Sequence, residues 1–255
     1  MKRLLFGFFL LVLVTGFAGV AYAGNGLQKI AVGARSAGMA GVDLAIATDA
    51  TALLTNPAGL IRLSGHRIDF GSDLYMPTMS FENDINDQSG EGTTLASPLF
   101  AYGFKLKDKP FAGGIGVFTN SAMGVSDFYL NHALVGDEAH YYSRVQLLKL
   151  AGAIAWAPHE TVSLAIAPQF LLGRFDYQMP YTQPAWWLHG NADPSNNRQF
   201  GEIFREDPFN YDEVVLPVKT NNATTYGVGA RVGVLWMPHE IVQVGATYQL
   251  QINME

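Results

Sequence analysis

The residues best suited to chemistry are two histidine and glutamate pairs, His159-Glu160 and His239-Glu240. Neighbouring imidazole and carboxylate groups can bind a metal ion or transfer protons. Each pair lies in a short turn, however, and nothing else in the sequence converges on either one. A nucleophile elbow, an H-E-x-x-H motif and a phosphate-binding loop are also missing from the sequence. We interpret both pairs as turn residues, and we expect no enzyme activity, no catalytic residue, no metal and no cofactor.

Composition and the N-terminus restrict the class of protein. The 255 residues include no cysteine, and the 22 acidic and 16 basic side chains form no Lys/Arg-rich run, which argues against nucleic acid as a partner. Lys2 and Arg3 precede an apolar stretch over residues 4–14, and Ala21-Tyr22-Ala23 has the small-x-small pattern of a cleavage site. We predict a signal peptide over residues 1–23 and not a membrane anchor.

The rest of the chain contains no run of the roughly 20 apolar residues that a membrane-spanning helix needs. Instead, apolar side chains alternate with small or polar ones, as from Arg67 to Met76. A period of two predicts strands, and an apolar face opposite a polar one suits a barrel in lipid or a half-buried sheet. Strands are predicted to open at Arg67, Ser97, Phe111, Ser143, Thr161, Thr225 and Ile241.

A repeated motif distinguishes the two alternatives. W-x-P-H-E-x-V begins at Trp156 and recurs at Trp236, each time joining two strands by a short turn, whereas the opposite connections are long. Short turns at one end, long loops at the other and aromatic residues at the rim are typical of an outer-membrane barrel. A soluble β-sandwich is not expected to have a glycine-rich, polar inner face. We therefore predict an all-β fold, an antiparallel transmembrane barrel over residues 66–255, in the outer membrane of a Gram-negative cell.

Residues 24–65 are different in kind, because this stretch is rich in glycine and alanine and lacks alternation. We predict a compact plug of short helices, with Asp49 capping a helix that Asn56-Pro57 ends. We also expect the inward charged residues of the strands to contact this plug rather than lipid. They are Arg67, Asp69, Asp73 and Arg231.

The plug carries G-x-R-x-x-G-x-x-G from Gly33, then Asp49-Ala50, then N-P-A-G-L from Asn56. This order resembles the FadL/TodX (OMPP1) family of outer-membrane transporters for long-chain fatty acids and aromatic hydrocarbons. The resemblance implies that the plug is the hatch inside a fourteen-stranded barrel, and that Asn56, Pro57 and Ala58 form a functional hatch motif. Taken alone, Asn56-Pro57 is equally an ordinary helix-stop turn.

The run from Gly113 to Asp127 resembles the kinked third strand of these transporters, which opens the wall sideways beneath the hatch. The resemblance implies a lateral opening at Asn120, Ser121, Ala122, Met123 and Gly124. The alternative is that the strand ends at Thr119 and these residues begin a loop.

Substrate contacts are expected from the resemblance. The long segment 178–222 is interpreted as an extracellular loop whose aromatic residues receive a hydrophobic substrate, although they could equally pack on the barrel rim. Candidate substrate-binding residues are Phe118, Trp186, Trp187, Leu188, Phe204 and Phe209. Met179 falls where the family has a cation, so Arg174 is the candidate partner for a carboxylate.

The expected function is passive uptake of long-chain fatty acids or other hydrophobic compounds by a monomer in contact with outer-membrane lipid. The alternative is a PorV-like accessory barrel of a secretion system, without transport activity. Seven strands are an odd number, and bacterial single-chain barrels have even numbers. We therefore expect these residues to be the first half of a barrel that continues beyond Glu255.

Overall fold

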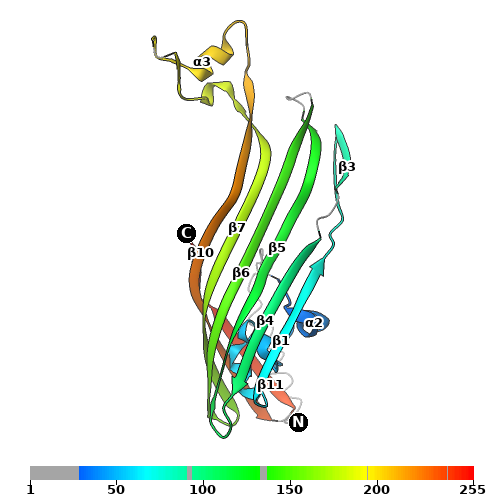
Figure 1. The fold of residues 1–255 in the computed structure, drawn as a ribbon, viewed down its shortest axis with the longest axis vertical. Helices are drawn as coiled ribbons and strands as arrows, with labels where there is room; N and C mark the ends of the chain where they lie inside the picture. The colour runs from blue at the N-terminus through cyan, green and yellow to red at the C-terminus, as the bar shows by residue number, and fades with distance from the viewer. Residues whose placement is uncertain (1–28, 91–93, 133–136, 194, 240) are drawn as a thin grey trace, which may run out of the picture.

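The computed structural model describes residues 29–90, 94–132, 137–193, 195–239 and 241–255. The predicted signal peptide, 1–23, lies outside these residues. A single antiparallel sheet dominates the fold, and it is long, curved and open (Figure 1). Its strands, in spatial order, are β1 (His66–Tyr75), β4 (Leu95–Lys105), β5 (Phe111–His132), β6 (Asp137–His159), β7 (Val162–Pro184), β10 (Glu213–His239) and β11 (Val242–Gln249).

Smaller elements lie at the two ends of this sheet. The plug consists of α2 (Gly33–Gly38) and two 3-10 helices, η1 (Ala50–Leu53) and η2 (Pro57–Arg62). A hairpin of β2 (Met79–Asn83) and β3 (Asn86–Gly90) follows β1, and β12 (Asn253–Met254) pairs with β10. At the end far from the plug lies a cap of η3 (Ala185–Trp187), β8 (Asn191–Asp193), β9 (Arg198–Gln199) and α3 (Phe200–Arg205), seen in Figure 1.

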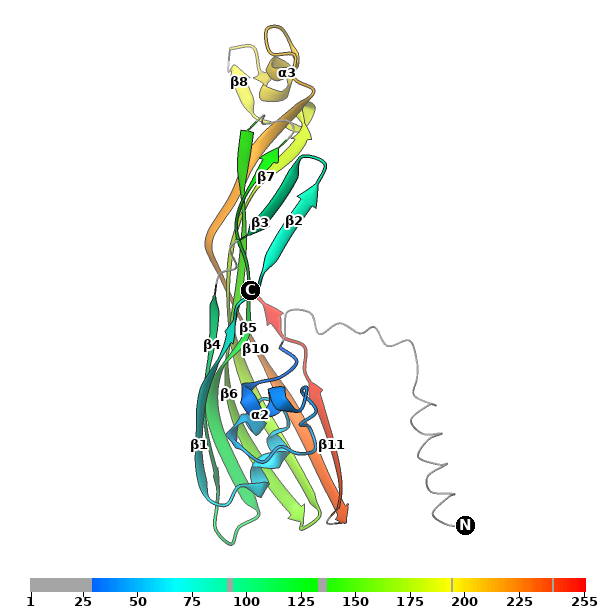
Figure 2. The same cartoon turned by 90° about the vertical axis from the view of Figure 1, so that its right-hand side faces the viewer.

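The sheet curls around the plug, which lies on its concave side between β1 and β11 (Figure 2). Leu53 and Leu60 of the plug are fully buried and form one apolar core with Leu99 and Phe118 of the wall. The other wall residues of this core are small: Ala101, Ala112, Ala151, Ala153, Ala155 and Ala167. Small inward side chains leave room for the plug. The prediction was a glycine-rich, polar inner face, whereas alanines form most of the wall surface that packs on the plug.

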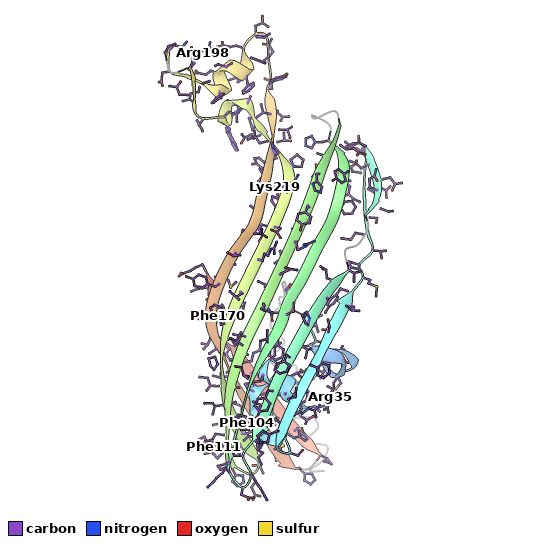
Figure 3. The ribbon with its side chains drawn as sticks, in the orientation of Figure 1. Arg35, Phe104, Phe111, Phe170, Arg198 and Lys219 are labelled. Carbon is purple, nitrogen blue, oxygen red and sulfur yellow. The ribbon has the colours of Figure 1, made fainter. Side chains whose placement is uncertain are left out.

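The opposite, convex face of the sheet is apolar and uncovered. Phe70 is 82% exposed and Ile154 is 66% exposed. Figure 3 shows Phe104 and Phe111 near the short turns of the sheet and Phe170 further along it. A protein in water would bury such a face, because exposing it to water is unfavourable. Contact with the hydrocarbon of a lipid bilayer carries no such free-energy penalty. No helix in the described part of the chain is both long and apolar enough to cross a membrane.

The two W-x-P-H-E turns have the same geometry. In both hairpins the strand register shifts between the tryptophan and the histidine of the motif. The Nδ1 atom of His159 accepts a hydrogen bond from the backbone of Thr161 at 3.2 Å, and that of His239 accepts one from Ile241 at 3.4 Å. Each ring thus closes its own turn, which confirms the interpretation of these histidines as turn residues. No cluster of three potential metal ligands occurs among the described residues.

The seven predicted strands are confirmed, but two predicted loops are wrong. Residues 178–184 and 213–222 are not loop, because β7 and β10 continue as a ladder from Val218↔Met179 to Glu213↔Pro184. The Asn-, Asp-, Ser- and Gly-rich composition of residues 82–94 also predicts a loop, but residues 82–90 belong to the β2–β3 hairpin. Residues 82–90 are mostly polar and lack the alternation that identifies a strand, whereas Val214, Leu216 and Val218 alternate with Glu213 and Lys219, a strand signal that was missed.

Candidate functional site

Asn56 anchors the plug to the wall. Its side chain is fully buried, and its Oδ1 accepts from the backbone of Ala58 at 3.2 Å, which caps η2. Its Nδ2 donates to the carbonyl of Leu44 at 2.8 Å and to the carbonyl of Val234 in β10 at 3.0 Å. Asn56-Pro57 therefore starts a helix and bonds to the barrel, which is more than a helix-stop turn does. Pro57 and Ala58 are buried beside it, and Ser163 of β7 donates to the carbonyl of Ala58 at 3.1 Å.

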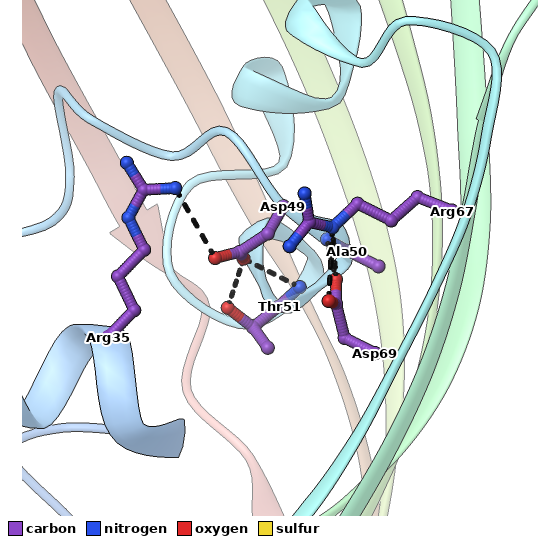
Figure 4. A network of polar contacts seen from close by, with 6 residues as sticks. All are labelled: Arg35, Asp49, Ala50, Thr51, Arg67 and Asp69. Carbon is purple, nitrogen blue, oxygen red and sulfur yellow. Dashed lines mark hydrogen bonds and ion pairs between the residues drawn. The ribbon is translucent and has the colours of Figure 1, made fainter.

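A polar network joins the start of η1 to β1 (Figure 4). Asp49 caps η1 by accepting from the backbone of Thr51 at 3.0 Å, as predicted. Asp69 accepts from the backbone of Ala50 at 2.7 Å and from Nε of Arg67 at 2.8 Å. Arg67 therefore supports the plug indirectly, through Asp69.

The other end of η1 is held by Arg231 of β10. Its guanidinium donates to the carbonyl of Leu54 and, at 3.1 Å, to that of Thr55. These carbonyls follow the last turn of η1, where a cation is favourable. The prediction that inward charges meet the plug is thus confirmed for Asp69 and Arg231, and Asp73 meets it through Lys29.

Glycines in the wall allow the plug to approach closely. A Cβ atom at Gly233 would lie 2.3 Å from Oδ1 of Asn56 and 3.0 Å from Pro57. A Cβ at Gly103 would lie 2.7 Å from the side chain of Leu63. These glycines therefore belong to the surface of the wall on which the plug packs, and their role is not limited to turns or strands.

The ladder between β4 and β5 stops partway along both strands. Its last pair is Leu99↔Phe118, although β4 continues to pair with β1 as far as Leu95. The carbonyl of Pro98 faces β5, where it accepts from Oγ1 of Thr119 at 3.0 Å. The amide and carbonyl of one residue point to the same side of a strand, so the proline ring occupies the place of the next donor to β5. Pro98 thus ends the ladder, a signal that our sequence analysis missed.

Strand β5 continues beyond this point, so the alternative that it ends at Thr119 is wrong. Its pairing with β6 skips Asn120 and resumes at Ser121, so Asn120 forms a β-bulge. Ala122, Met123 and Gly124 are strand residues that pair with Gln146, Val145 and Arg144. Residues 119–130, which we call the β5 edge, pair with no strand on the β4 side within the described part of the chain.

The first described residue of the plug segment lies at this edge. The backbone of Lys29 donates to the carbonyl of Asn120 at 3.2 Å, which satisfies a group that the bulge leaves outside the ladder. Its Nζ bonds to Ser97 of β4 and to Asp73 of β1 at 3.2 Å. Lys29 therefore bridges three strands where the β4–β5 ladder has ended. No local sequence pattern predicts this contact.

A cavity of about 650 Å³ lies between the β2–β3 hairpin and the far part of the β5 edge. Met79 and Phe81 line it from the hairpin, and Phe128, Leu130 and Tyr141 line it from the sheet. This volume is in the range of small-molecule sites, and polar residues contribute as much to the lining as these apolar and aromatic ones. The hairpin is fastened to β5 by Asn86, whose amide exchanges two hydrogen bonds with the backbone of Asn131 at 2.7 and 3.0 Å.

The six candidate substrate-binding residues, five of which are aromatic, lie in two places. Phe118 is fully buried beneath the plug, whereas the other five lie in the cap at the far end of the sheet. In the cap, Phe204 and Phe209 pack edge to face at 5.6 Å, and Trp186 and Trp187 at 5.5 Å. Both tryptophans are about half exposed, and Leu188 follows them at the end of η3. The cap therefore presents aromatic surface.

Polar turns hold the cap together. Asp193 accepts hydrogen bonds from the hydroxyl of Ser195 at 2.6 Å and from its backbone at 3.0 Å, and these bonds hold the pKa of its carboxyl below the usual value. Gln199 and Glu202 form a capping box at the start of α3.

The candidate carboxylate partner, Arg174, lies in β7 on the same alternation as Leu172, an exposed residue of the convex face. Its Nε is 3.2 Å from the carboxylate of Asp176, and its side chain is 49% exposed. Asp176 in turn accepts from the backbone of Asn222, where β10 has a bulge. Arg174 is thus engaged with a neighbouring carboxylate and lies apart from the plug.

Comparison with known proteins agrees with this architecture. Residues 14–255 match the family described as outer membrane protein transport protein (OMPP1/FadL/TodX). No curated protein sequence matches the chain. The toluene transporter TodX of Pseudomonas putida is 14% identical, with a TM-score of 0.62 over 81% of this chain and 52% of that one. A deltaS2 mutant of TodX, a monoaromatic hydrocarbon channel, is 15% identical, with a TM-score of 0.61 over 81% of this chain and 51% of that one.

At this identity the likeness to solved structures concerns the fold. The chain spans about half the length of these structures, and its open sheet corresponds to about half of a barrel. The family match, in contrast, covers nearly the whole chain, including the plug motif and the strands. The chain therefore belongs to the outer membrane protein transport protein family, OMPP1/FadL/TodX.

Proposed function

We propose that the full-length protein is a monomeric outer-membrane channel for passive uptake of long-chain fatty acids or other hydrophobic compounds, without chemistry or cofactor. The substrate reaches the aromatic cap, enters the lumen above the plug, and leaves sideways into lipid at Asn120–Gly124. The hatch motif Asn56-Pro57-Ala58 anchors the closed plug to the wall, and the plug rearranges toward the kinked strand to release the substrate. The observation that carries the proposal is the β4–β5 ladder, which stops at Leu99↔Phe118 beside a bulge and beside the plug.

The low solubility of a hydrophobic substrate in water favours a lateral exit. Each CH₂ group kept out of water is worth about 0.8 kcal/mol, so a path that ended in the aqueous periplasm would oppose transfer of a long acyl chain. A side exit delivers the substrate directly to lipid. Such an exit needs a break in strand pairing, and the ladders from β5 through β10 are interrupted only locally, whereas the β4–β5 ladder does not resume in the described residues.

The cavity beside the β2–β3 hairpin supports a lateral exit at the β5 edge. It lies against the β5 edge, where Phe128 and Leu130 contribute to its lining. A hydrophobic compound leaving the wall in this region would remain in contact with apolar side chains. The TodX structures are of a toluene transporter, and a monoaromatic compound is therefore a second substrate class to test.

The test is uptake by cells that lack their own transporters for these compounds. The full-length protein is expressed in the outer membrane, insertion is checked by heat-modifiable electrophoretic mobility, and initial uptake of labelled oleate and labelled toluene is compared with an empty vector. We expect faster uptake of at least one of the two. An inserted barrel with no gain for either compound would contradict the proposal and favour a PorV-like accessory role.

A further inference from the structure

One inward-facing cation of the wall has no counterion within the part of the chain that the structure describes. Lys149 lies in β6 on the same face as Ala151, Ala153 and Ala155, beneath the plug, and only 1% of it is exposed. Its Nζ makes no hydrogen bond or ion pair with any described residue, unlike Arg231, which bonds to the plug. A buried ammonium without an anion is strongly unfavourable, so its presence calls for an explanation.

Unpaired polar groups flank this lysine on both sides. Gln169 of β7 is 4% exposed, and neither its Oε1 nor its Nε2 has a hydrogen-bond partner among the described residues. Ser121 of β5 is 1% exposed, and its hydroxyl is also unpaired there. Buried polar atoms are nearly always bonded, so several unpaired ones in one place indicate that a partner is added.

The strand register brings the three side chains together. Lys149 pairs with Leu171, while Gln169 pairs with Ala151, so Lys149 and Gln169 are diagonal neighbours on one face of the sheet. Ser121 pairs with Leu147 and is the diagonal neighbour on the other side. Diagonal neighbours are about 7–8 Å apart, a gap that one small polar group between two long side chains can bridge.

The cluster also lies at the break in the wall. Lys149 pairs with Phe118, which is itself the last β5 residue to pair with β4. The bulged Asn120, whose Nδ2 is buried and unpaired among the described residues, follows two positions later. A group bound at Lys149 would therefore lie at the level where the β5 edge begins.

We propose that Lys149, Gln169 and Ser121 form the site for the carboxylate head of a long-chain acid as it passes to the β5 edge. This inference rests on the proposed function. The ammonium, the Gln169 amide and the Ser121 hydroxyl donate to the two carboxylate oxygens, and the alkyl chain contacts Phe118. The site therefore selects amphiphiles with an anionic head over neutral hydrocarbons, and plug movement must precede binding because the closed plug covers Lys149.

The test compares a charged and an uncharged form of one chain. Labelled oleate and labelled methyl oleate are bound to the purified full-length protein in a neutral detergent. For Lys149→Met we expect the affinity for oleate to fall at least about tenfold relative to the wild type, the usual effect of losing a charge-assisted hydrogen bond. The affinity for methyl oleate should not change. Lys149→Arg keeps the charge and should restore oleate binding. Lys109→Met, in an exposed turn, is the matched control.

Gln169→Leu tests the cluster without removing the charge, and we expect the same selectivity with a smaller loss. Heat-modifiable mobility confirms that each variant is folded. Three results would overturn the assignment: unchanged oleate binding by Lys149→Met, an equal loss for both probes, or a selective loss in Arg174→Met alone. In each of these cases uptake by the wild type can still stand. Wild-type protein that neither binds nor transports either probe would overturn the proposed function as well.

Discussion

The wall of this protein is built differently on the two sides of Phe118. Toward the short turns, β4 and β5 are fully paired, alanines and glycines face the plug, and Asn56 and Arg231 bond the plug to β10. Beyond Phe118 the β4–β5 ladder is missing, β5 is bulged, and buried polar atoms of Asn120 and Ser121 lack partners among the described residues.

This difference indicates that one region of the wall holds the plug and the other is able to move. The paired region has the close packing that holds a structure in one state, and the bonds of Asn56 and Arg231 fasten the plug to it. The region at the β5 edge is held by few contacts, chiefly those of Lys29 with Asn120, Ser97 and Asp73. Segments with few such contacts open at low free energy, so we expect movement to begin there. Changes in the two regions should therefore have different effects.

The largest effect is expected from Asn56→Leu. It removes three hydrogen bonds in a fully buried position and leaves the carbonyls of Leu44 and Val234 without their donor. The plug should lose about 2–4 kcal/mol of its free energy of unfolding. The measurement is the urea concentration at which trypsin cleaves the plug at Arg35 or Arg62 in the inserted protein. Asn56→Asp keeps the cap on Ala58 but sets a buried carboxylate oxygen against the carbonyls of Leu44 and Val234, so it should be no more stable than Asn56→Leu. An unchanged midpoint for Asn56→Leu would refute the anchor.

A somewhat smaller effect is expected from Gly233→Ala. The added methyl group meets Oδ1 of Asn56, which cannot move without losing its bonds to Leu44 and Val234. Overpacking of this kind costs about 1–3 kcal/mol, read out by the same protease assay. Gly71→Ala is the matched control, because a Cβ there meets no atom within 4 Å. Equal effects of the two changes would show that the wall glycines do not seat the plug.

The smallest effect on stability is expected from Lys29→Met, in the other region. Its ion pair with Asp73 is partly exposed, and such pairs contribute about 1 kcal/mol or less. The protease midpoint at Arg62 should hardly change, whereas hydrogen exchange at the backbone of Lys29 and its neighbours should accelerate. If Lys29→Met destabilised the plug as much as Asn56→Leu does, the two regions would not be distinct.

The sequence was most informative wherever lipid lies on one face. Alternation predicted the apolar convex face, and the Gly/Ala run predicted the plug and the cap of η1 by Asp49. It failed for the β2–β3 hairpin, whose residues 82–90 are mostly polar and lack alternation, and it overlooked the alternation of Val214, Leu216 and Val218 in the far part of β10.

Parts of the candidate site were also beyond local pattern. Lys149 occupies an ordinary inward position of a predicted strand, and its environment depends on Gln169 and Ser121 from two other strands. Pro98 was a readable signal, since a proline within a strand indicates an edge or a break in pairing. Lys29 could not have been predicted, because its partners are supplied by tertiary structure.

The most direct test of a lateral exit is the uptake of labelled oleate by a variant in which the break between β4 and β5 is closed. Deletion of Asn120 removes the bulge, and Pro98→Val restores the missing donor, so the β4–β5 ladder can continue past Leu99↔Phe118. Pro168→Val is the control, because Pro168 of β7 lies where the β6–β7 ladder is interrupted, away from the β5 edge. We predict that uptake of labelled oleate by the closed variant falls to the level of an empty vector, although the barrel is inserted and the plug resists protease. Undiminished uptake by such a barrel would contradict a lateral exit at the β5 edge.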